Sequence, residues 1–304
     1  MALAARRLHV SQPALSRQIR ELERVLGVRL FDRIGRRIVL ATDGEEILAR
    51  SRRLLAEAES LHERAAALGG ARGGVLRVGT TPQFLEAGLP QVLSMYRRRH
   101  PDVEIRLVEG GGDQLEHAVE QGELHLAAPT FHIVEPLGSV LLYPVRVLAI
   151  MARRHRLAAR RTLAVSDLRH ETLLMLAPGF GSRRLFEEAC HEARVEPRSL
   201  VESRSPRSLI ALAAGGHGIA IVPSVVTLSG AAIAVAGLVR NGRPLGTWTY
   251  AVWDTRRHLP LYAASFLKTL VEYTRHSYPG HRLGLTREVR RPPEMRTAPG
   301  GSRA

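Results

Sequence analysis

The segment from Ser11 to Glu23 constrains this chain most, because its residues separate onto two faces of one helix. Ser11 is suited to cap the first turn, and Pro13 is tolerated there because its missing N–H would have no partner within the helix. Apolar residues recur at helical spacing and form a stripe that must pack on protein, namely Leu15, Ile19, Leu22 and Leu26. The opposite face carries hydrogen-bonding side chains. The pattern predicts either a helix that reads DNA or an amphipathic helix with a solvated polar face.

The flanking segments favour the DNA-reading interpretation. Residues 2–8 predict a short helix, and a tight turn at His9-Val10 separates it from the capped helix, which is helix-turn-helix order. Residues 30–40 predict two short strands around a glycine-containing turn, a basic wing whose arginines would contact phosphates or a minor groove. We expect the following residues to bind DNA: Ser11, Gln12, Pro13, Ser16, Arg17, Arg20, Arg33, Arg36 and Arg37.

These segments carry a family resemblance. The runs RRLHVSQPALSRQIRELERVLGVRLFDR and GRRIVLATDGE resemble the LysR-type transcriptional regulators, and VES at 201–203 and LAAGGHGIAIVP at 212–223 extend the resemblance to about residue 277. It implies an N-terminal winged helix-turn-helix, a long linker helix that dimerises, and a two-lobed α/β effector domain folded like a periplasmic binding protein. The implied function is sequence-specific transcriptional regulation by a homodimer or homotetramer on double-stranded promoter DNA, under the control of a small-molecule effector bound between the lobes.

The expected domain order follows from a helix-capping segment and a glycine-rich segment that mark the domain boundaries. Residues 1–42 form the DNA-binding domain, and Thr42-Asp43-Gly44-Glu45 has the form of a capping box that opens a long helix. Residues 43–73 comprise that helix and a glycine-rich hinge. Its apolar seam has no following helix close enough to cover it, which favours a second subunit over an intradomain partner. The effector domain spans 74–278, with lobe I at about 74–162 and 268–278 and lobe II at about 163–267, and a disordered basic tail occupies 279–304.

Beyond residue 74, short apolar strands alternate with amphipathic helices, which predicts parallel sheets that bind small molecules at the carboxyl ends of their strands. In the turn from Thr80 to Gln83, hydroxyls and amides at a helix start would suit a carboxylate. Ser182 is expected to cap a helix, and Arg183 to pair with an anion or face solvent. Position and resemblance together give the expected effector-binding set: Thr80, Thr81, Pro82, Gln83, Thr130, Phe131, Ser182, Arg183, Ser203 and Pro206.

Several function classes are disfavoured. A single cysteine, Cys190, excludes an intrachain disulfide and a cysteine-based zinc site, and we expect it to be a partly buried small side chain. The histidines lack metal-ligand spacing, and no nucleophile or paired-carboxylate motif is present, so we expect no metal, no cofactor and no enzyme activity. His125 stands where the family usually has an acidic residue and is expected at the surface or a hinge. With no signal peptide and no membrane-length apolar run, the expected location is cytoplasmic, without a membrane partner.

Two features leave alternatives open. The formal net charge of +15 supports a polyanionic partner. A genome with a strong base bias that favours arginine codons would also explain this total. The family also carries another helix before the helix-turn-helix pair, and this chain begins only about seven residues ahead of the turn. Either the start lies upstream, or the DNA-binding head is truncated. The alternative function is therefore a cytoplasmic ligand-binding or dimerising protein with impaired DNA binding.

Overall fold

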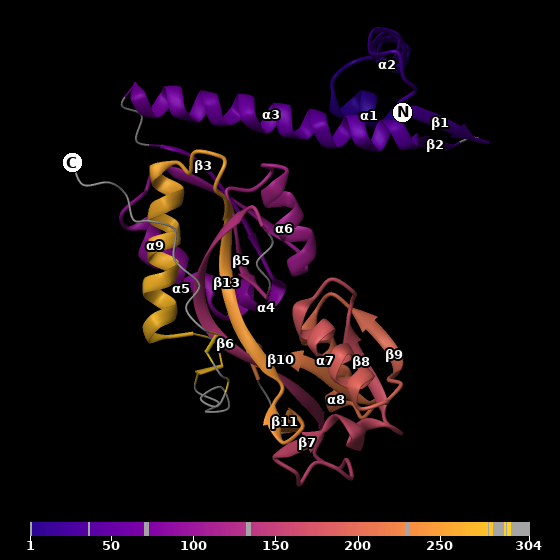
Figure 1. The fold of residues 1–304 in the computed structure, drawn as a ribbon, viewed down its shortest axis with the longest axis vertical. Helices are drawn as coiled ribbons and strands as arrows, with labels where there is room; N and C mark the ends of the chain where they lie inside the picture. Colours follow the sequence, from indigo (N-terminus) through magenta and orange to yellow (C-terminus); the bar gives the residue numbers. More distant parts are fainter. Residues whose placement is uncertain are drawn as a thin grey trace. The chain divides into compact units, whose positions relative to one another are not determined.

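The computed structural model describes residues 2–35, 37–69, 73–131, 135–228, 232–278, 280–281, 289 and 291–292. The chain divides into two compact units, Met1–Glu59 and Ser60–Ala304 (Figure 1). The long helix α3, Thr42–Leu68, runs from the first unit into the second.

The first unit is a winged helix-turn-helix, as expected. Its helices are α1 (Ala2–Arg7) and α2 (Gln12–Leu26), and its wing is the antiparallel pair β1 (Phe31–Ile34) and β2 (Arg37–Leu40). The Ser11 hydroxyl accepts a hydrogen bond from the backbone N–H of Ala14 at 3.3 Å, which confirms the cap. Gly27 ends α2 in the left-handed conformation, with φ of 70°, where glycine has no side-chain penalty. Local signals therefore determine both ends of this helix.

Helix α3 begins at Thr42 itself, so Thr42 is a helical residue and not the predicted cap. Gly44 in its first turn is required by packing, because a Cβ atom there would lie 2.0 Å from the carbonyl oxygen of Leu30. Farther along, Leu55 and Leu61 are each 70% exposed. The helix thus carries an apolar seam that the described residues of this chain leave uncovered.

Lobe I of the second unit is a sheet covered by helices. The strands lie in the order β4-β3-β5-β13-β6, and β3 is parallel to both β4 and β5. The strands are β3 (Gly74–Thr80), β4 (Val103–Glu109), β5 (Leu126–Thr130), β13 (Gly246–Asp254) and the first half of β6 (Leu137–Ala152), and the helices are α4 (Pro82–Ala87), α5 (Leu89–Arg97), α6 (Gly112–Glu120) and α9 (Leu261–His276).

Lobe II continues from the second half of β6 in the order β6-β10-β8-β9, with β11 also paired to β6. Its elements are β7 (Thr162–Ala164), a 3₁₀ turn (Val165–Leu168), β8 (Thr172–Leu176), α7 (Gly181–Glu192), β9 (Arg198–Ser203), α8 (Pro206–Ala214), β10 (Ile219–Pro223), β11 (Ile233–Arg240) and β12 (Arg243–Pro244).

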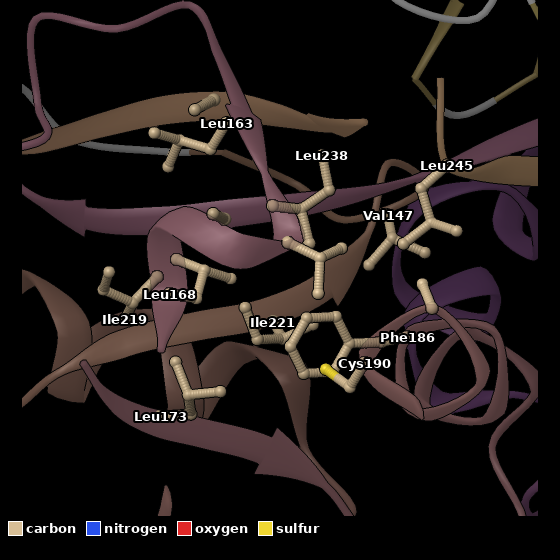
Figure 2. Packing of buried hydrophobic residues seen from close by; sticks show 14 of the residues in the cluster. Val147, Leu163, Leu168, Leu173, Phe186, Cys190, Ile219, Ile221, Leu238 and Leu245 are labelled. Atoms are coloured by element: carbon tan, nitrogen blue, oxygen red, sulfur yellow. The ribbon is translucent and has the colours of Figure 1, made fainter. Parts of the chain in front are cut away.

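Each lobe has its own apolar core. In lobe I, Phe84, Tyr96 and Phe266 pack together with no more than 1% exposure. In lobe II, Phe186 and Cys190 on α7 point into a cluster of aliphatic side chains (Figure 2). Cys190 is therefore fully buried, more deeply than expected. Because the two cores are separate, each lobe can move as a rigid body.

The lobe boundaries differ from those expected. β6 pairs with β13 up to Arg146 and with lobe II strands from Val147 onward. The chain returns to lobe I at Gly246, because β13 pairs with β5 and β6. Lobe II therefore spans about 147–245, and all of β13 and α9 belong to lobe I. β11 was not predicted from the sequence; it is an apolar strand that pairs with both β6 and β7.

The predicted disordered tail is also corrected where the structure describes it. Val289 is buried, and its carbonyl oxygen accepts a hydrogen bond from Trp248 Nε1 at 3.4 Å. The guanidinium of Arg291 lies 5.6 Å from the centre of the Trp248 ring, within cation–π range. These residues pack on β13. Most of the predicted tail lies outside the described residues.

Candidate functional site

A groove in the first unit brings the start of α2 and the wing together. It has a volume of about 640 Å³ and is lined by Gln12 and Ser16 from α2 and by Arg33 and Arg37 from the wing, among others. Four residues predicted to bind DNA therefore share one concave surface. Arg36 lies outside the described residues.

The other predicted DNA-binding residues divide by role. Ser11 and Pro13 shape the start of the helix, since Ser11 caps it and Pro13 occupies its first turn. Arg17 and Arg20 are exposed on α2, and Arg20 Nε donates to the Ser16 carbonyl at 3.2 Å, which directs that side chain back along the helix. The arrangement presents amide, hydroxyl and guanidinium groups in the way that base edges and phosphates require.

In the second unit, the carboxyl end of β3 carries the predicted turn from Thr80 to Gln83. Thr80 is fully buried, and its hydroxyl donates to the Ala128 carbonyl at 2.8 Å, so its role is structural. Thr81 Oγ1 and Gln83 Oε1 are also buried, and neither has a hydrogen-bond partner among the described residues. Pro82 opens α4 beside them. Buried polar atoms without partners are uncommon and mark a place where a ligand's polar atoms could be accommodated.

The end of β5 lies against lobe II. Thr130 is fully buried with its hydroxyl 3.5 Å from the Tyr250 carbonyl, whereas Phe131 packs on the first turn of α7. A Cβ atom on Gly181 would lie 2.4 Å from the Phe131 ring. Phe131 is therefore a contact between the lobes.

Two expectations on α7 are wrong. The cap position belongs to Phe180, and Ser182 lies within the helix, where it is buried. Arg183 faces neither a free anion site nor solvent, since its guanidinium pairs with Glu187 at 2.7 Å and Glu202 at 2.8 Å. The two carboxylates therefore neutralise the charge of Arg183 within lobe II.

Helix α8 of lobe II also contacts α4 of lobe I. Ser203 accepts a hydrogen bond from the Ser205 backbone N–H at 3.1 Å, and Ser205 in turn caps α8. Pro206 is buried in the first turn. The two residues predicted here thus set the geometry of a helix start beside α4.

The lobes touch at a further set of places on α6. A Cβ atom on Gly111 would lie 2.5 Å from the carbonyl oxygen of Gly179. Arg184 of α7 pairs with Asp113 at 3.5 Å, and Arg204 Nη2 donates to Gln114 Oε1 at 2.6 Å. We call this region, together with the ends of β3 and β5, the lobe junction. It joins the N-terminal ends of α6 and α7.

Sequence analysis missed Glu116, which is only 6% exposed on the inner face of α6. Burial raises its pKa to about 7, with a further increase from Asp113, against opposing effects of Arg184 and the Thr130 hydroxyl. A carboxylate among the apolar residues of a helix face was the available signal. Glu116 places a titratable group at the lobe junction near neutral pH.

The surface position expected for His125 is wrong, since its side chain is only 8% exposed and contacts Glu63 of α3 and Arg77 of β3. The residue joins the end of the linker helix to lobe I, which is compatible with the alternative prediction of a hinge position. The described residues contain no cluster of metal-binding side chains. No helix in the described part of the chain is long and apolar enough to span a bilayer.

Comparisons with known proteins match both units. The family model for the LysR substrate binding domain matches residues 69–275, and that for the bacterial regulatory helix-turn-helix protein, lysR family, matches residues 1–45. The HTH-type transcriptional regulator CbbR of Rhodospirillum rubrum is 29% identical over 270 residues, which cover 88% of this chain and 89% of that protein. The hydrogen peroxide-inducible genes activator of Dickeya chrysanthemi is 33% identical over 223 residues, 73% of each chain.

Solved structures agree with this similarity. The crystal structure of full-length CbnR complexed with its target DNA superposes with a TM-score of 0.62 at 25% identity, covering 90% of this chain and 93% of that one. The similarity extends over the head, the long helix and the two lobes.

Proposed function

The chain belongs to the LysR family of bacterial transcriptional regulators, and we propose specific roles for its residues in binding DNA, an effector and a second subunit. It is a DNA-binding regulator with an effector-binding domain, and family members are regulators rather than enzymes. We propose that this chain acts in the cytoplasm through binding alone, with neither cofactor nor catalysis.

The DNA-binding proposal rests on the shared groove. The first turns of α2 enter a major groove, where Gln12 and Arg17 read base edges, while Arg33 and Arg37 of the wing contact phosphates. Base contacts discriminate between sequences, whereas phosphate contacts mainly add salt-sensitive affinity.

Selection from random duplexes, followed by titration of the selected site at several salt concentrations, tests this assignment. Gln12→Ala should relax sequence preference, and Arg37→Ala should weaken binding to all sequences and reduce the salt slope by about one. An unchanged selected sequence for Gln12→Ala would exclude its role in base reading.

The effector proposal rests on Thr81 Oγ1 and Gln83 Oε1, two buried atoms that lack partners among the described residues. The hydroxyl can donate to a ligand oxygen, and the amide oxygen can accept from a ligand hydroxyl. The adjoining helix starts favour negative charge. We therefore propose a small hydroxylated carboxylate as the effector class, bound at the lobe junction near Thr81, Gln83, Thr130 and Phe131.

A thermal-shift screen of small carboxylates, followed by calorimetric titration of any stabilising compound, tests the effector site. Thr81→Ala should weaken binding about tenfold or more, because the ligand oxygen loses its donor. Thr162→Ala is a matched control, because Thr162 is an exposed residue of β7. Equal affinities for the two variants would argue against the role of Thr81.

Self-association is proposed from the exposed apolar seam of α3, which a second copy of the helix would cover. Analytical ultracentrifugation tests the assembly, and we expect a homodimer or homotetramer that Leu55→Glu weakens.

The effector can alter DNA binding only through its different affinities for two arrangements of the protein.

A further inference from the structure

The last turns of α3 are fastened to lobe I by a largely buried polar cluster that neither DNA binding nor effector binding explains. The two oxygens of Glu63 contact different partners, with Oε2 3.1 Å from His125 Nε2 and Oε1 3.2 Å from Arg77 Nη1. The side chains of Glu63 and His125 are 11% and 8% exposed. Residues from Ser60 onward belong to the same compact unit as lobe I, so these contacts lie within one unit.

The hydrogen bonds assign the proton on the His125 ring. Nδ1 accepts from the backbone N–H of Arg77 at 3.0 Å, so this nitrogen carries no proton. Nε2 lies 3.1 Å from both Glu63 Oε2 and Arg77 Nη2. Because Nδ1 is the acceptor, Nε2 carries the proton of the neutral ring, and of these two neighbours only the Glu63 carboxylate can accept it. The ring also packs edge-on against Tyr262 of α9, with the centroids 5.8 Å apart. His125 therefore connects β3, α9 and the end of α3 in one defined orientation.

The cluster keeps Glu63 charged. Burial raises the pKa of this carboxyl, but the hydrogen bond from His125 and the charge of Arg77 outweigh burial, so the pKa is lowered overall. Removing one partner of a buried charged group is costly, because the remaining charge loses its compensation. A second contact, between Arg64 Nη1 and His258 Nε2 at 3.4 Å, lies on the same turns of the helix.

The same two strands reach the lobe junction. β3 contains Arg77 and ends at Thr80, and β5 follows His125 and ends at Thr130. At the usual rise per residue, these separations along the strands are about 10 Å and about 17 Å. The strands are parallel neighbours, with Val78 opposite Leu126. Each strand therefore reaches the junction at its carboxyl end, while the cluster residues lie farther back, with Arg77 in the middle of β3 and His125 directly before β5.

We propose that Glu63, Arg77 and His125 form a coupling clasp, through which the arrangement of the lobe junction controls how firmly the end of the linker helix is held. This proposal rests on the proposed function of the junction as the effector site. β3 and β5 are the physical connection, and Glu63 is the contact on the helix. His125 is a positioning residue, since it acts on the helix only through Glu63.

Hydrogen–deuterium exchange of the full-length protein tests the clasp, with the amides of residues 60–68 as the readout. Glu63→Gln should increase their exchange about tenfold, whereas Glu57→Gln, which neutralises an exposed carboxylate on the same helix, should not. Two replacements of His125 separate positioning from packing. His125→Asn keeps an acceptor near Nδ1 and loses the Glu63 contact, and His125→Gln keeps a donor near Nε2. Faster exchange in the Asn variant than in the Gln variant supports the clasp, and equal exchange overturns the role of His125.

Coupling to the junction is tested with Gly111→Ala, whose added methyl group would meet the Gly179 carbonyl oxygen. In the wild-type background, Gly111→Ala should change the amide exchange rates of residues 60–68 about threefold or more. In the background of Glu63→Gln, the same substitution should leave these rates unchanged. Identical effects in both backgrounds, or no effect in either, would overturn the coupling. Because no effector is added, these results do not depend on which small molecule the junction binds.

Discussion

Arg184 of lobe II lies 3.5 Å from Asp113 of lobe I, so an ion pair spans the two halves of the effector domain. Both side chains are more than a third exposed, and such pairs contribute little to folding. Because the pair joins the two lobes, we expect its main effect to be on the balance between lobe arrangements.

The first prediction concerns that balance. Asp113→Asn should leave the melting temperature nearly unchanged, because exposed ion pairs contribute about 1 kcal/mol or less. It should weaken binding of an effector that favours contacting lobes by about twofold to fivefold. Calorimetric titration checks the affinity. A drop in melting temperature of 10 °C or more would show that the pair is a folding contact instead.

The second prediction concerns the glycines at the start of α6. Gly111→Ala should destabilise the contact between the lobes by about 1–3 kcal/mol, because the methyl group collides with backbone. Gly112→Ala is the matched control, since its Cβ would meet only Glu116 Oε1 at 3.7 Å, an ordinary contact. Urea unfolding compares the two variants. Equal stabilities would mean that the lobes do not press together at Gly111.

The third prediction is a pH dependence from Glu116, whose pKa burial raises from 4.5 to about 7. The folded state binds this proton more tightly than the unfolded state, so the contribution of Glu116 to stability falls as pH rises from about 4.5 to 7. Glu116→Gln should remove that fall. The free energy of unfolding of the variant minus that of the wild type should therefore be larger at pH 8 than at pH 4.5, by on the order of 2–3 kcal/mol. Urea unfolding of both proteins at the two pH values measures this, and parallel pH profiles would contradict it.

The fourth prediction concerns oxidation. Burial raises the pKa of Cys190 to about 12, so almost no thiolate forms at neutral pH. Although a similar protein is named a hydrogen peroxide-inducible genes activator, Cys190 of this chain should resist peroxide and iodoacetamide while folded and react once unfolded. Mass spectrometry of native and urea-treated protein distinguishes the two states. Rapid modification of the native protein would contradict its burial.

The parts of the structure that sequence predicted well depend on local signals. The cap at Ser11 and the glycine stop at Gly27 act within one or two turns, so nearby residues suffice to define α2. The class of fold followed from alternation of strands and helices together with the resemblance.

The errors come from long-range pairing. Arg183 was available to an anion in the sequence, but folding brings Glu202 from the neighbouring strand to it. The surface alternative for His125 fails because its partner Glu63 lies 62 residues earlier in the chain. Contacts of this kind cannot be predicted from spacing. β11 is a different case, because Asn241 and Gly242 directly after it form a tight hairpin turn to β12, so a local signal for this strand was present.

The chain crosses between the two cores at two points in extended backbone. β6 leaves lobe I at Arg146–Val147, and the chain returns at Leu245–Gly246. A chimera joined at these two points would exchange a complete lobe II without dividing either apolar interior. Related regulators could then be recombined as interchangeable halves, and the donor of each half would reveal which side of the junction dictates ligand preference.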